Sequence, residues 1–133
     1  ANATFFPIYT GESTATQGQA NCEQQLAKMH WPLDVLVLGM GNDGHTASLF
    51  PLCPSLKTAL STKDICIATL APVEPTDRMT LSANTLQLAQ NTYLHIEGKA
   101  KLDVLIEAAT LKDNLQMPIY TFFKPSLSIH WCP

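Results

Sequence analysis

An aspartate and a histidine two residues apart, Asp43 and His45, lie in a glycine-rich segment and could carry out acid–base chemistry. An unperturbed imidazole has a pKa near ~6.5, which suits proton transfer at neutral pH. The nearby carboxylate could orient that ring or favour its charged form. Backbone N–H groups of a glycine-rich loop could bind a developing oxyanion. The pattern predicts a base that activates water for attack on an acyl carbon, while a purely loop-capping role for both residues stays open.

The same segment has the glycine spacing of a dinucleotide-binding loop, at Gly39, Gly41 and Gly44. That function requires a full helix directly after the loop, whereas Pro51 cuts the segment short. It would also place the Asp43 carboxylate where a pyrophosphate binds. The spacing therefore favours a ligand loop of another kind.

The elements that must position this loop follow from the hydrophobic pattern. Continuous apolar runs are typical of strands buried on both faces, and they occur at residues 34–40, 65–70 and 92–96. Helical periodicity occurs at residues 19–30, 83–90 and 101–109. Short strands are expected at 4–9, which could instead be an entry segment, and at 128–131, and a short helix or strand at 117–124. The alternation predicts a mostly parallel α/β sheet, with the glycine loop at the carboxyl end of its first buried strand.

Composition narrows the function further. The chain has 133 residues, a size typical of one domain, and eight basic against 11 acidic residues give a net charge of −3. The sequence has no lysine- or arginine-rich patch, so we expect no nucleic-acid partner. It has no apolar run near ~18 residues, so we expect no membrane span. It has no basic start followed by an apolar run, so we expect no export signal. The chain has four cysteines, Cys22, Cys53, Cys66 and Cys132, and their spacing is not that of a zinc site, so we expect no bound metal. We expect all four to be free thiols, which indicates a reducing compartment and therefore a cytoplasmic location.

Three blocks of sequence resemble the 6-phosphogluconolactonase family. Residues 39–51, GMGNDGHTASLFP, are similar to the family signature over thirteen contiguous positions. Residues 75–81, PTDRMTL, and residues 98–101, GKAK, are similar to two further blocks in the same order. The resemblance covers the whole chain.

This resemblance implies a doubly wound α/β fold with helices on both faces, shared with glucosamine-6-phosphate deaminases and ribose-5-phosphate isomerases. It implies hydrolysis of 6-phosphoglucono-δ-lactone, a phosphorylated sugar lactone, to 6-phosphogluconate without a cofactor. The family's base falls on His45 and its supporting carboxylate on Asp43. The family's arginine falls on Arg78 and its phosphate-contacting lysine on Lys101. The backbone at three further positions would contact the substrate, namely Gly41, Asn42 and Gly44.

Two motifs of the family do not occur in the sequence, a Ser-Gly-Gly phosphate loop and an Asp-Glu-Arg segment. We therefore expect residues 1–133 to be a single α/β unit that forms the C-terminal portion of a lactonase domain. We also expect an exposed apolar sheet face, through which the chain could self-associate. The alternatives are a sugar-phosphate isomerase or deaminase of the same superfamily and a non-catalytic binding or assembly remnant.

Overall fold

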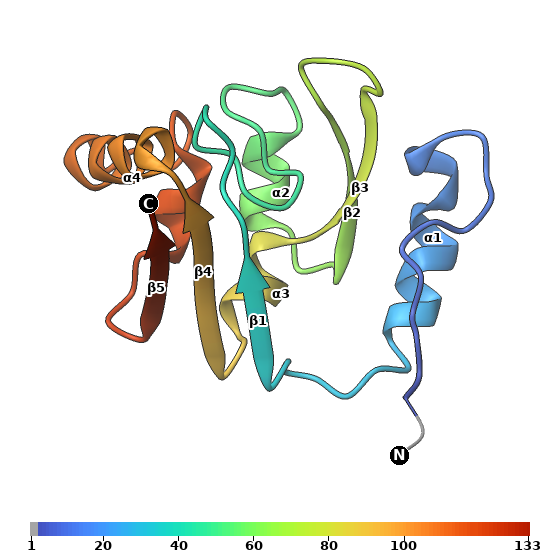
Figure 1. Cartoon of the computed structure of the whole chain (residues 1–133). Helices are drawn as coiled ribbons and strands as arrows, with labels where there is room; N and C mark the ends of the chain where they lie inside the picture. The colour runs from blue at the N-terminus through green and yellow to red at the C-terminus, as the bar shows by residue number, and fades with distance from the viewer. Residues whose placement is uncertain (1–2) are drawn as a thin grey trace.

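The computed structural model describes residues 3–133, which form an α/β unit (Figure 1). The elements in chain order are α1 (Ala15–Leu26), β1 (Val35–Leu38), α2 (Leu56–Ser61), β2 (Cys66–Leu70), β3 (Asp77–Leu81), α3 (Ala83–Gln87), β4 (Asn91–Glu97), α4 (Lys99–Leu111), a 3-10 helix η1 (Pro118–Phe122) and β5 (Leu127–Cys132). Residues 4–9 form the entry segment, and residues 117–124 contain the 3-10 helix. None of the helices formed by residues 3–133 has the length and apolar character that crossing a bilayer requires.

A three-stranded parallel sheet carries the glycine-rich loop. The strand order is β1-β4-β5, and β1 pairs with β4 in the register Leu36↔Thr92 and Leu38↔Leu94. The carboxyl ends of β1 and β4 therefore meet at one edge of the sheet, where the glycine loop follows β1 and α4 follows β4. The mostly parallel α/β architecture predicted from the sequence is confirmed.

The strand predicted at residues 65–70 exists as β2, but it is not part of the parallel sheet. It pairs with β3 as a separate antiparallel hairpin, in the register Cys66↔Leu81 and Leu70↔Asp77. A continuous apolar run reports burial but not the direction of the neighbouring strand. The expectation that this run joins the parallel sheet was therefore wrong.

Only one face of the parallel sheet is covered by helices within the described chain. Leu36, Leu38 and Leu94 point into a core to which α2, α3 and α4 all contribute. On the opposite face, Val35 and Val37 have exposed fractions of 56% and 65%. Burial along β1 thus alternates, which corrects the reading of this run as buried on both faces and confirms the expected exposed apolar face.

Helix α1 lies beside the β2–β3 hairpin and not on the parallel sheet (Figure 1). Glu23 accepts hydrogen bonds from the backbone N–H groups of Ile65 and Cys66, at 2.8 and 2.9 Å. Gln19, one turn earlier, accepts from the N–H of Ala68 at 2.9 Å. These side chains satisfy a strand edge that would otherwise present unpaired donors.

Replacing Glu23 with alanine is expected to lower the free energy of unfolding by about 2 kcal/mol, because two backbone donors lose a charged acceptor. Urea unfolding followed by circular dichroism measures this loss. Glu107→Ala, on an exposed position of α4, is the matched control and should stay within about 0.5 kcal/mol of the wild type. Equal stability of the two variants would contradict the edge-capping role.

Candidate active site

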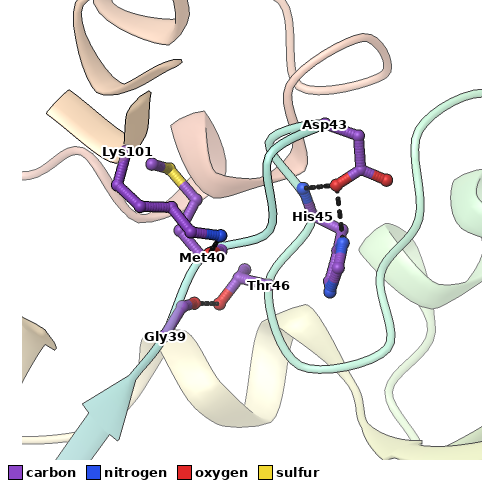
Figure 2. Close-up of polar contacts among 6 residues, drawn as sticks. All are labelled: Gly39, Met40, Asp43, His45, Thr46 and Lys101. Carbon is purple, nitrogen blue, oxygen red and sulfur yellow. Dashed lines mark hydrogen bonds and ion pairs between the residues drawn. The ribbon is translucent and has the colours of Figure 1, made fainter. Parts of the chain in front are cut away.

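The loop after β1 closes on itself through short-range hydrogen bonds. The Thr46 hydroxyl donates to the Gly39 carbonyl at 2.7 Å, and the Gly41 N–H donates to the His45 carbonyl at 2.8 Å. The Gly44 N–H donates to the Gly41 carbonyl at 3.1 Å. The loop therefore presents His45 from a defined turn at the sheet edge (Figure 2).

Asp43 and His45 form the pair that their spacing suggested. Asp43 Oδ1 lies 2.6 Å from His45 Nδ1 and also accepts the His45 backbone N–H at 3.1 Å. Partial burial by itself would raise the pKa of Asp43, but these hydrogen bonds and the charge of the imidazole outweigh it and hold that pKa below its ordinary value. The carboxylate is therefore charged at neutral pH. With Nδ1 held by Asp43, Nε2 is the nitrogen left for a reacting molecule.

Two glycines allow this turn to pack closely. A Cβ at Gly41 would overlap with both the His45 ring and the Asp43 carboxylate. Gly44 has φ of +79°, and a Cβ there would overlap with the sulfur of Met117. A side chain at either position is therefore incompatible with the observed loop.

The backbone N–H groups of the three predicted contacts differ in whether they already have an acceptor inside the loop. The N–H groups of Gly41 and Gly44 are engaged inside the loop, by the His45 and Gly41 carbonyls. The Asn42 N–H has no acceptor among the residues that the structure describes. Of the three predicted backbone contacts, Asn42 is the one whose N–H is not engaged inside the loop.

Lys101 comes from the first turn of α4 and reaches the same place. Its Nζ donates to the Met40 carbonyl at 2.5 Å, as Figure 2 shows. Lys101, His45 and Gly41 line one shallow pocket at the carboxyl end of β1. A half-buried lysine that lines the same pocket as the imidazole makes this pocket suitable for an anionic ligand.

Arg78 does not share that pocket. It belongs to β3, and its Nη1 donates to the neighbouring Asp77 carbonyl at 3.4 Å. It lines a separate groove with Tyr9 and other residues of the N-terminal segment. The antiparallel hairpin contacts the glycine loop at Ser48, whose N–H donates to Thr80 Oγ1 at 3.3 Å. Arg78 therefore belongs to the strand that contacts the loop, but it does not line the His45 pocket.

The structure adds contacts that sequence reasoning missed. The ring of Phe50 lies against the His45 imidazole, with centroids 4.8 Å apart. The Ile119 N–H donates to the Gly44 carbonyl at 3.0 Å, next to the Met117 contact beneath the turn. Phe50 stands inside the loop motif and could have been suspected, whereas nothing local in the sequence signals Met117 or Ile119. Within residues 3–133, no three His, Cys, Asp or Glu side chains come together as metal ligands.

Comparisons with known proteins place this geometry in context. Residues 1–131 match the family described as glucosamine-6-phosphate isomerases/6-phosphogluconolactonase. The chain is 38% identical to the 6-phosphogluconolactonase of Pseudomonas aeruginosa, over 100% of this chain and 57% of that protein. It is 39% identical to that of Rhizobium meliloti, over 100% of this chain and 60% of the relative. The crystal structure of a 6-phosphogluconolactonase from Shewanella baltica superposes with a TM-score of 0.88 at 36% identity, covering 93% of this chain and 55% of the other. The chain spans little more than half the length of each.

Proposed function

The chain belongs to the family of glucosamine-6-phosphate isomerases and 6-phosphogluconolactonases, and from this membership we propose that the protein hydrolyses 6-phosphoglucono-δ-lactone to 6-phosphogluconate. The observation that carries the proposal is the Asp43–His45 pair at 2.6 Å, in a loop that also meets Lys101. The relatives named above as 6-phosphogluconolactonases favour this reaction over a sugar-phosphate isomerase or deaminase reaction.

The mechanism uses one imidazole as base and then as acid. His45 Nε2 takes a proton from water, and the water oxygen attacks the lactone carbonyl carbon. The carbonyl oxygen becomes an oxyanion, to which the Asn42 N–H is free to donate. Collapse of this intermediate breaks the bond to the ring oxygen, which receives the proton from the imidazolium. Asp43 stabilises the charged ring throughout and holds its Nδ1, so that Nε2 is the nitrogen that exchanges the proton.

Lys101 would bind an oxygen of the substrate, with its phosphate as the preferred partner. Its hydrogen bond to Met40 uses one of the three ammonium donors and leaves two for the ligand. Arg78 is proposed as a second anion contact only for a substrate long enough to reach its groove.

Lys101→Met is expected to raise KM about tenfold or more with a smaller change in kcat, because a charged donor to the substrate is lost while the Asp43–His45 pair remains. Initial-rate kinetics with the lactone measures both constants. Lys99→Met is the control. Lys99 lies two positions before Lys101, but its exposed side chain forms an ion pair with Asp103 and does not line the pocket. A similar KM change in both variants would show that general charge, and not the position of Lys101, attracts the substrate.

We also propose that residues 1–133 form the C-terminal portion of a longer lactonase domain and that further chain packs on the sheet face bearing Val35 and Val37. Two observations support this arrangement: the chain covers only 57% of the Pseudomonas aeruginosa relative, and the two valines are exposed. The alternative is that a second copy of the chain packs on this face. Four free cysteines fit a reducing compartment, the cytoplasm.

The intact mass of the natural protein tests whether residues 1–133 are part of a longer domain. Lactonase assays on that protein and on residues 1–133 alone test the activity of each. Release of ammonia from glucosamine-6-phosphate, without lactone hydrolysis, would favour a deaminase, and no activity at all would favour a non-catalytic remnant.

A further inference from the structure

The His45 imidazole is packed against an aromatic ring in a tilted arrangement. The Phe50 and His45 ring centroids lie 4.8 Å apart with an interplanar angle of 43°, within the range of favourable aromatic pairs. Phe50 is buried, with only 8% of its surface exposed, whereas His45 is half-buried and lines the pocket that Lys101 also lines. The phenyl ring therefore lies on the inner side of the imidazole.

The backbone between the two residues is folded to bring the rings together. Ala47 adopts φ of +50°, and the Leu49 N–H donates to the Thr46 carbonyl at 2.9 Å, which turns the chain back. After Phe50, the Leu52 N–H donates to the Leu115 carbonyl at 3.0 Å. Phe50 is thus held from both sides by contacts that do not involve His45, so its ring can act as a fixed surface.

Asp43 and Phe50 constrain different motions of the same imidazole. The hydrogen bond that Asp43 Oδ1 accepts from the imidazole fixes the position of Nδ1 but leaves the ring plane free to tilt about that contact. A ring packed against the imidazole restricts this tilt, and the two constraints together define where Nε2 points. Small errors in the direction of a reacting group can lower the rate substantially.

We propose that Phe50 is a positioning residue, whose ring holds the His45 imidazole plane so that Nε2 faces the pocket shared with Lys101. This proposal rests on the proposed function for its effect on rate, but the geometric part stands on the contact itself. Phe50 touches no reacting atom, and it acts only through His45.

The test compares three variants of the protein at its native length. Phe50→Leu keeps an apolar side chain but removes the ring, Phe50→Tyr keeps the ring, and Phe122→Leu makes the same change at another buried position of the core. We expect Phe50→Leu to lower kcat roughly tenfold, about 1.4 kcal/mol in the barrier, with little change in KM. Phe50→Tyr should restore kcat to within about twofold of the wild type, and Phe122→Leu should lower the melting temperature without changing kcat of the folded protein.

A second measurement keeps the proposal separate from the proposed function. In NMR spectra, the His45 ring protons should lose the ring-current shift in Phe50→Leu and move toward the positions of an exposed histidine such as His30, but not in Phe122→Leu. Unchanged His45 signals in Phe50→Leu would overturn the proposal, as would an equal loss of kcat in Phe122→Leu. Absence of lactonase activity in the wild type would refute the proposed function alone, because the NMR comparison would still decide the role of Phe50.

Discussion

His45→Ala is expected to lower kcat for lactone hydrolysis by about 10²–10⁴-fold while KM changes little, because the variant loses the only imidazole in the pocket that residues 3–133 form. Lys101 remains to bind substrate, and its hydrogen bond to Met40 does not involve His45. Hydrolysis releases one proton from the acid product, so a pH-stat assay at neutral pH measures the rate. The rate must be compared with spontaneous lactone opening in the same buffer.

A matched histidine variant separates base catalysis from a general effect of the substitution. His30→Ala changes an exposed histidine in the segment after α1, outside the glycine loop, and should keep the wild-type kcat. Asp43→Asn should lower kcat less than His45→Ala, since the base is retained and only its charged partner is lost. Turnover by His45→Ala at the wild-type rate would refute the assignment of the base.

Gly41→Ala is expected to lower kcat by about 10²-fold, because its Cβ would occupy the space of the His45 ring and the Asp43 carboxylate and push the pair apart. The effect should appear in kcat more than in stability, since the loop can relax by moving the exposed carboxylate or the half-buried ring. Steady-state kinetics, with the His45 ring signals as a structural readout, measures this displacement.

The same loop offers a control two residues earlier. A Cβ at Gly39 would meet no atom within 4 Å, and neither Gly39 nor Gly41 has a positive φ. Gly39→Ala should therefore retain kcat within about twofold, although the added methyl group is free to change KM. If both alanine variants lose kcat equally, loop flexibility and not the space beside His45 is what the glycines provide.

The exposed face with Val35 and Val37 shows what the hydrophobic pattern can predict and what it cannot. The run at β1 identified a strand and the loop that follows it, and both are present. The same pattern could not show that α2, α3 and α4 all pack on one side, so that Val35 and Val37 stay exposed within the described chain. The spacing of apolar residues predicts the type of element, but the path of the chain decides which apolar side chains are covered by other elements.

The sequence by itself determined the Asp43–His45 pair, because two residues so close along the chain can meet through a local turn that glycines permit. Only the tertiary structure decided the rest of the pocket. Parallel pairing of β1 with β4 brings the start of α4, and with it Lys101, to the Met40 carbonyl. The antiparallel pairing of β3 with β2 instead leaves Arg78 in a separate groove. Contacts between distant residues depend on strand order and direction, and the residue types of an isolated segment do not specify either one.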